Sequence, residues 1–198
     1  MRLHGQKVAV LMESDFYEPE ILYYQRRFAE EGARVHFLTR LWGNERIVFR
    51  GHEHRMPFTV SESFEDMDEY ALKEFSAVIV PSGMVADRLR YTEDVDKLPP
   101  ATAFLRRAFA DPAIVKGIIC HGMWLAAPIP QVVEGRRAVV HNNLLGDLKN
   151  MGGVYVDQDV VDDGDLVTAR TGDHCHVFAR TIIDRLAHRT TRPGLTAA

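Results

Sequence analysis

Short runs of apolar residues alternate along this chain with longer stretches whose apolar positions recur at helical spacing. Runs of this kind predict buried strands, and the stretches predict amphipathic helices. The predicted strands are 8–12, 35–39, 77–81, 114–119, 138–140 and 166–169, and the predicted helices are 21–31, 98–110 and 177–188. Because strands that alternate with helices are typical of a parallel sheet covered on both faces, we expect an α/β protein, a three-layer α/β/α sandwich with a mostly parallel central sheet.

The remaining segments are less regular. Residues 41–64 show no clear period, with a hairpin expected around Gly51, and 153–156 is expected to pair with 160–161. No repeat or linker interrupts the pattern, so residues 1–189 are expected to form one domain, followed by a frayed tail at 190–198.

Composition narrows the class of protein. The 198 residues are 46 % hydrophobic and 26 % charged, enough for one domain with a substantial core. The net charge of −4 gives no reason to expect nucleic acid or an anionic membrane as a partner. The apolar run at 8–12 is too short for a signal peptide or a membrane span, and two cysteines do not make a disulfide framework. We therefore expect a reduced, cytoplasmic protein.

The strand at 114–119 stops at Cys120, and His121, Gly122 and a predicted helix from 123 to 127 follow. A sharp turn between a strand and a helix exposes a nucleophile, and the helix N-terminus stabilises negative charge on it. We therefore predict that Cys120 is a nucleophile whose thiol is acidified toward thiolate. The alternative is an inert buried cysteine, which the strand–turn–helix setting makes the weaker interpretation.

Ligand sites in parallel sheets lie beyond the carboxyl ends of the strands. The loop after Met12, the Ser82–Gly83 loop and the Cys120 turn should therefore meet. Backbone N–H groups at Gly83 and His121 would form an oxyanion hole, or Gly83 is only a turn residue. His121 either pairs with the thiol or forms a wall of the site.

Residues 13–20 contain four carboxylate side chains. One of them is expected beside the Cys120 sulfur as a proton shuttle, although Glu18 and Glu20 are also placed to complement a helix dipole. The aromatic residues Tyr17 and Trp124 are expected to line the pocket or to pack in the core.

Two histidine clusters, His52-x-His54 and His174-Cys175-His176, raise the question of a metal. A metal site needs three or four converging ligands, so these histidines are more simply surface or helix-capping groups. We expect neither a metal nor an organic cofactor.

Two strings carry a family resemblance: Ala77-Val-Ile-Val-Pro-Ser-Gly83, and Ile118-Ile-Cys-His-Gly-Met-Trp124. Together they resemble the PfpI/ThiJ family of the DJ-one superfamily, with its flavodoxin-like, class I glutamine amidotransferase-like fold. The resemblance extends from Val8 to about Leu186. It implies that Cys120 is the family nucleophile and that His121 is its usual neighbour.

The resemblance also implies an acid/base residue. The family's first-loop glutamate matches Glu18, whereas alignment with members that read Glu-Phe-Glu-Asp puts Tyr17 at that position. In the PfpI branch a partner subunit supplies a carboxylate to the histidine, and Asp87 stands at that place. This arrangement implies an intersubunit Cys-His-Asp triad in a homodimer or larger homo-oligomer.

Three further pocket residues follow from the resemblance. Ser82 replaces the first Gly of the family's Pro-Gly-Gly, Gly122 belongs to its Cys-His-Gly turn, and Arg170 lies in a segment similar to its Ser-Arg-x-Pro. The leading hypothesis is a cysteine-dependent enzyme of the glyoxalase III or deglycase type that converts methylglyoxal to lactate. The alternatives are an intracellular peptidase or amidase, and a redox-sensing or chaperone-like stress protein.

Overall fold

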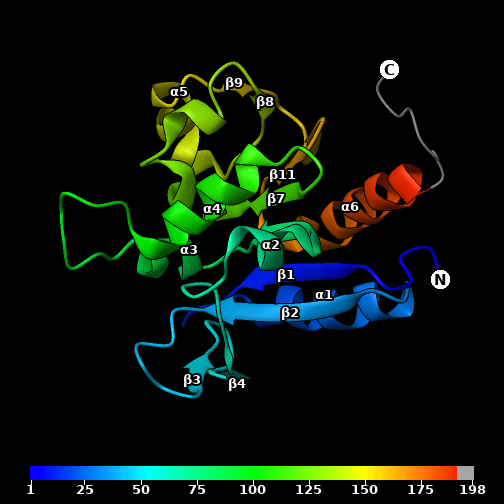
Figure 1. Cartoon of the computed structure of the whole chain (residues 1–198). Coiled ribbons are helices and arrows are strands. Elements are labelled where there is room, and N and C mark those ends of the chain that lie inside the picture. Colours follow the sequence, from blue (N-terminus) through cyan, green and yellow to red (C-terminus); the bar gives the residue numbers. More distant parts are fainter. Residues whose placement is uncertain (191–198) are drawn as a thin grey trace.

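A seven-stranded sheet forms the centre of the protein in the computed structural model, which describes residues 1–190 (Figure 1). The strand order is β10-β11-β7-β6-β1-β2-β5, and all neighbours are parallel except β10 and β11. The strands of this sheet are β1 (Lys7–Leu11), β2 (Arg34–Thr39), β5 (Glu62–Ser63), β6 (Phe75–Val80), β7 (Val115–Ile119), β10 (Val160–Asp163) and β11 (Leu166–Ala169). The predicted tail lies outside the described residues apart from Thr190, which ends the last helix.

Helices cover the sheet and complete the predicted three-layer sandwich (Figure 1). They are α1 (Glu18–Glu30), α2 (Glu69–Lys73), α3 (Val85–Leu89), α4 (Pro100–Ala110), α5 (Leu145–Asn150) and α6 (Cys175–Thr190), with 3₁₀ helices η1 (Cys120–Ala126), η2 (Pro130–Val132), η3 (Asn142–Leu144) and η4 (Gly172–His174). Helices α1 and α6 pack together, and α4 packs against η1. The contact of α6 with the sheet is close: a Cβ at Gly117 of β7 would lie 2.7 Å from Ile182 and 2.8 Å from Phe178.

Two small sheets lie outside the central one. The hairpin expected near Gly51 is confirmed as β3 (Ile47–Arg50) and β4 (Pro57–Val60). The predicted strand at 138–140 is instead β8 (Arg137–Ala138), which pairs with β9 (Val154–Tyr155). The predicted pairing of 153–156 with 160–161 is wrong, because β10 forms a hairpin with β11 through a turn in which Gly164 has a φ of 74°.

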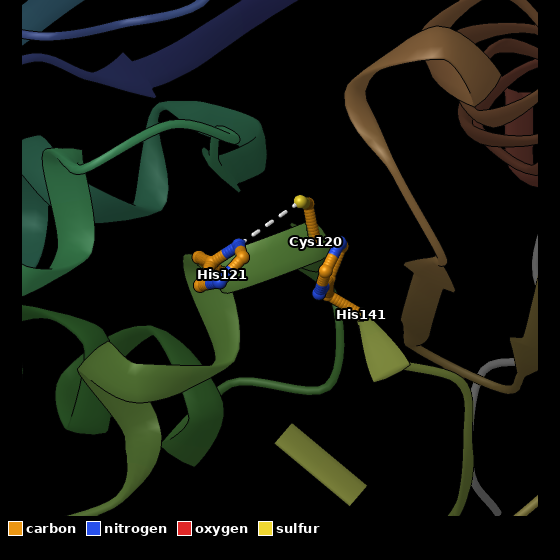
Figure 2. Close-up of side chains that lie close together, drawn as sticks. All are labelled: Cys120, His121 and His141. Atoms are coloured by element: carbon orange, nitrogen blue, oxygen red, sulfur yellow. Dashed lines mark hydrogen bonds between the residues drawn. The ribbon is translucent and has the colours of Figure 1, made fainter. Parts of the chain in front are cut away.

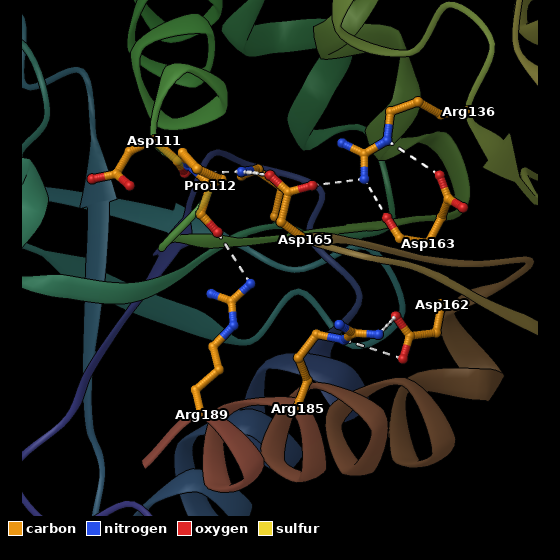
Figure 3. Close-up of polar contacts among 9 residues, drawn as sticks. Asp111, Pro112, Arg136, Asp162, Asp163, Asp165, Arg185 and Arg189 are labelled. Atoms are coloured by element: carbon orange, nitrogen blue, oxygen red, sulfur yellow. Dashed lines mark hydrogen bonds and ion pairs between the residues drawn. The ribbon is translucent and has the colours of Figure 1, made fainter. Parts of the chain in front are cut away.

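A buried ion pair links β7 to the turn before β11. The side chain of Lys116 is fully buried, and its ammonium group donates to the carboxylate of Asp165 and, at 3.1 Å, to the carbonyl of Asp111. Asp165 also accepts from Arg136 at 2.7 Å (Figure 3). Burial lowers the pKa of Lys116, and the Asp165 carboxylate opposes that change by stabilising the charged form.

Removing one half of this pair should destabilise the fold. We expect Asp165→Ala to lower the free energy of unfolding by about 3 kcal/mol, because it leaves the Lys116 ammonium buried without its counter-charge. The double variant Lys116→Met/Asp165→Ala should recover most of that loss, since neither charge remains. Urea denaturation of the three proteins measures both effects. A double variant no more stable than Asp165→Ala would show that the buried, unpaired Lys116 charge is not the cause of the loss.

Candidate active site

The Cys120 turn has the strained geometry expected of a nucleophile elbow. Cys120 follows β7 directly and has a φ of 59°, a left-handed conformation that non-glycine residues rarely adopt. A Cβ at Gly122 would lie 2.7 Å from the carbonyl oxygen of Val80, so the turn packs on the end of β6 too closely for any larger residue. The expected helix after the turn is the 3₁₀ helix η1, which begins at Cys120 itself.

The three predicted segments meet at the carboxyl ends of β1, β6 and β7. The N–H of Met84 donates to the carbonyl of Asp15 at 3.0 Å, and Phe16 forms an isolated bridge with Gly83. A cavity of about 410 Å³ opens where they converge. It is lined by Tyr17, His52, Glu53, Ser82, Gly83, Met84, Cys120, His121, His141, Gly172 and Asp173.

The Cys120 thiol lies almost buried against this cavity, with 8 % of the residue exposed. Its Sγ is 3.3 Å from Nδ1 of His121 (Figure 2). Burial raises the pKa of the thiol to about 11, and the nearby Glu20 carboxyl raises it further, whereas backbone N–H groups of His121, Gly172 and Gly83 lower it. The predicted acidification of the thiol is therefore wrong for the free protein. Desolvation outweighs the N–H groups, so the nucleophile needs a base.

The His121 imidazole is positioned to act as that base. Burial lowers its pKa, and the neighbouring His141 lowers it further, so the ring is neutral at neutral pH. Its ring centroid lies 4.5 Å from that of His141 and 4.9 Å from Trp124, which meets it edge to face. Trp124 therefore positions the imidazole and is not among the residues that line the cavity.

His141 was not identified from the sequence. It caps η3, where its Nδ1 accepts at 3.3 Å from the N–H of Asn143. The signal was the apolar run 138–140 that ends at this histidine, the same pattern that singled out Cys120. The two residues meet because β8 places the end of that run beside the Cys120 turn.

Glu20 is the carboxyl group buried near the nucleophile. It is fully buried on α1, and its Oε2 accepts from the backbone N–H of Ser82 at 3.0 Å and from the Ser82 hydroxyl. Tyr24 lies nearby but outside hydrogen-bonding geometry, which leaves Oε1 of Glu20 without a partner among the described residues. Burial raises the pKa of Glu20 to about 7, against which the two Ser82 contacts act. This carboxyl therefore exchanges a proton near neutral pH.

Glu18 has a different role from the one expected. Its carboxylate accepts from the backbone N–H groups of Glu53 and His54, at 2.9 and 2.8 Å, and these contacts lower its pKa despite its burial. A Cβ at Gly51 would lie 2.1 Å from the same carboxylate. The expectation of Glu18 beside the sulfur is corrected: its carboxylate is bound by the backbone of the β3–β4 hairpin, and the carboxyl whose charge acts on the Cys120 thiol is that of Glu20. Glu20 was recognisable as the one carboxyl in line with Tyr24, four positions on, in the buried stripe of α1.

Tyr17 lines the cavity, as expected of this aromatic residue. Its hydroxyl donates to the Asp173 carboxylate at 2.8 Å, which, with burial, raises the pKa of Tyr17 to about 12. A Cβ at Gly172 would lie 2.5 Å from the Tyr17 ring and 2.8 Å from the Ser82 hydroxyl. Tyr17 and Ser82 therefore close the cavity against the end of β11.

Other predicted residues lie away from the cavity. The Arg170 guanidinium donates to the carboxylate of Asp157 at 2.6 Å and to the Tyr155 hydroxyl at 2.9 Å. His174 contacts Thr171 and Asp159, and Nδ1 of His176 donates to the backbone carbonyl of Asp173 at 3.0 Å, so neither joins the site. Asp87 is exposed on α3, and its contact with His121 of a partner subunit stays a prediction.

A nucleophile elbow at the carboxyl edge of a parallel sheet, with a cysteine facing a histidine, defines a class of α/β proteins with a cysteine-based site. The chain belongs to the DJ-1/PfpI family, whose model matches residues 6–185. It is similar to a deglycase of Pyrococcus horikoshii, with 27 % identity over 91 % of this chain and 99 % of that one. It is also similar to a putative cysteine protease of Bacillus subtilis, with 26 % identity over 92 % of this chain and 99 % of that one.

The fold is also found in solved structures. A two-domain protein of Anabaena variabilis, which contains DJ-1/ThiJ/PfpI-like and ferritin-like domains, superposes with a TM-score of 0.80 at 23 % identity. The match covers 98 % of this chain and 52 % of that protein, so this chain spans about half of it. This likeness confirms the flavodoxin-like sandwich. None of the helices formed by residues 1–190 has the length and apolar character needed to cross a bilayer.

Proposed function

We propose that this protein is a cysteine-dependent enzyme that converts small reactive carbonyl compounds, such as methylglyoxal, into hydroxy acids. The observation that carries this proposal is the Cys120 sulfur 3.3 Å from a neutral His121 ring, at the wall of a cavity of about 410 Å³. The names of the two relatives, a deglycase and a putative cysteine protease, support an enzyme built on this site. A cavity of this volume suits a small molecule.

The first step joins the sulfur to the aldehyde carbon. His121 takes the thiol proton as the C–S bond forms, which overcomes the raised pKa of Cys120. The carbonyl oxygen becomes the hydroxyl of a hemithioacetal. The N–H groups of Gly83 and His121 that face the sulfur stabilise the developing negative charge on that oxygen.

The second step moves a proton between adjacent carbons. We assign it to Glu20, because this carboxyl lies against Ser82 of the cavity wall and its charge acts on the Cys120 thiol, and because its pKa of about 7 lets it accept and return a proton near neutral pH. Removal of the hydrogen from the former aldehyde carbon and protonation of its neighbour convert the hemithioacetal into a thioester. Water hydrolyses the thioester to lactate and restores the thiol, so that methylglyoxal and one water give lactic acid.

The reaction can be followed in deuterated water. Incubation with methylglyoxal should yield lactate that carries deuterium on the carbon bearing the hydroxyl, since the Glu20 proton exchanges with solvent before it returns. Proton NMR measures both the product and its label. No lactate above the level given by the Cys120→Ala variant would contradict the proposal. Hydrolysis of amide or peptide substrates in its place would favour the peptidase hypothesis.

A further inference from the structure

Three potential metal ligands converge on one point of the cavity. Cys120, His121 and His141 each offer a ligand atom, and the three atoms lie within 4.8 Å of one another (Figure 2). They come from two segments: the Cys120 turn supplies two ligands, and the residue that caps η3 supplies the third. Neither histidine cluster noted in the sequence contributes to this group.

We propose that Cys120, His121 and His141 form a binding site for a zinc ion, with the fourth coordination position open to the cavity. Zinc favours thiolate and imidazole ligands in a tetrahedron, and bond lengths of about 2.3 Å to sulfur and 2.0 Å to nitrogen imply sulfur–nitrogen separations of roughly 3.5 Å. The observed separation of Sγ from Nδ1 of His121 is 3.3 Å. All three ligand atoms lie within 4.8 Å of one another, so binding requires the side chains to shift by roughly 1 Å toward tetrahedral separations.

The charge of the cavity also suits a cation. Among the described residues that line it, Glu53 and Asp173 carry carboxylates, and none is Lys or Arg. One contact opposes binding: the N–H of Asn143 donates to Nδ1 of His141, and this bond is given up if Nε2 becomes the ligand, because Nδ1 then carries the proton.

Binding exchanges a proton for the metal. The S–H bond breaks, the proton leaves to solvent, and the sulfur binds zinc as thiolate, with no change of oxidation state. The zinc ion is then bound by the sulfur lone pair of Cys120 with which the proposed reaction attacks the carbonyl carbon. If the proposed function holds, zinc is therefore a reversible inhibitor of the enzyme, whereas the binding itself does not depend on any activity.

Cobalt(II) is a spectroscopic probe for such a site. Titration of the protein with Co²⁺ should produce a sulfur-to-cobalt charge-transfer band in the near ultraviolet, which added Zn²⁺ removes. The band should be absent in Cys120→Ser. Zinc affinity, measured by competition with a chromophoric chelator, should fall at least about 100-fold in both His121→Ala and His141→Ala. Loss of a residue that only orients a metal ligand lowers metal affinity by about 10- to 100-fold, and loss of the ligand itself should lower it at least as much.

The matched controls are Cys175→Ser and His176→Ala, which change the same residue types outside the cavity and should retain wild-type zinc affinity. Circular dichroism confirms that each variant folds. The site is overturned if Cys120→Ser keeps the charge-transfer band, or if folded His141→Ala binds zinc as wild type does. Because these measurements record binding alone, they separate failure of the zinc site from failure of the carbonyl reaction.

Discussion

Cys120→Ala is expected to lower the turnover of methylglyoxal by at least about 1000-fold, because no other group in the cavity replaces the attacking sulfur. Cys120→Ser should be almost as inactive. A hydroxyl is a poorer nucleophile than a thiol, and its proton is harder to remove in the same desolvated position. Steady-state lactate formation measures both variants.

The second cysteine provides the matched control for this experiment. Cys175 has the same exposure as Cys120, 8 %, and burial raises the pKa of its thiol to about 12, but it does not line the cavity. Cys175→Ser should therefore keep turnover within a few-fold of wild type. If Cys175→Ser loses activity as completely as Cys120→Ala, the reaction does not depend on the Cys120 elbow alone and the assignment fails.

Glu20→Gln is expected to reduce turnover by about 100- to 10,000-fold, the range typical of a lost general acid or base. The amide oxygen of Gln can still accept from the N–H of Ser82, so the local structure is kept while the exchangeable proton is lost. Glu18→Gln is the matched comparison. Its carboxylate binds the hairpin backbone, so its effect on turnover should be much smaller. The reverse ranking of the two variants would make Glu18 the proton shuttle.

Glu20 should also make the stability of the wild-type protein depend on pH. The pKa of Glu20 is raised from 4.5 in the reference state to about 7 in the folded protein. Folding therefore favours the protonated carboxyl, and its contribution to stability is fully present below about pH 4.5 and lost as the pH rises through 7. Glu20→Gln removes this dependence.

Denaturation at pH 5 and at pH 8 measures the difference. Wild type should lose a few kcal/mol of unfolding free energy between pH 5 and pH 8 that Glu20→Gln does not lose. The variant is therefore expected to be more stable relative to wild type at pH 8 than at pH 5. A variant that is relatively more stable at pH 8 and yet inactive would separate the loss of the proton shuttle from damage to the fold. An unchanged difference between the two pH values would show that Glu20 is already ionised in the folded protein.

Much of the site could be predicted because its residues directly follow predicted parallel strands. Parallel strands bring their carboxyl ends to one edge, so the residues that end the runs at 77–81 and 114–119 had to meet. This rule placed Ser82, Gly83 and Cys120 around one cavity without any distance information. The order of the residues in the turn also suggested that His121 pairs with the Cys120 thiol, and the structure shows the two groups 3.3 Å apart.

The sequence by itself determined the alternation of strands and helices, the elbow and the identity of its cysteine. Only the tertiary structure decided which carboxyl lies near the sulfur, since Glu18 and Glu20 are two positions apart on α1 and point in different directions. The same is true of His141, which reaches the cavity through a strand pair outside the central sheet. The pKa of Cys120 was decided there as well, because desolvation depends on every atom packed around the thiol and not on the turn that presents it.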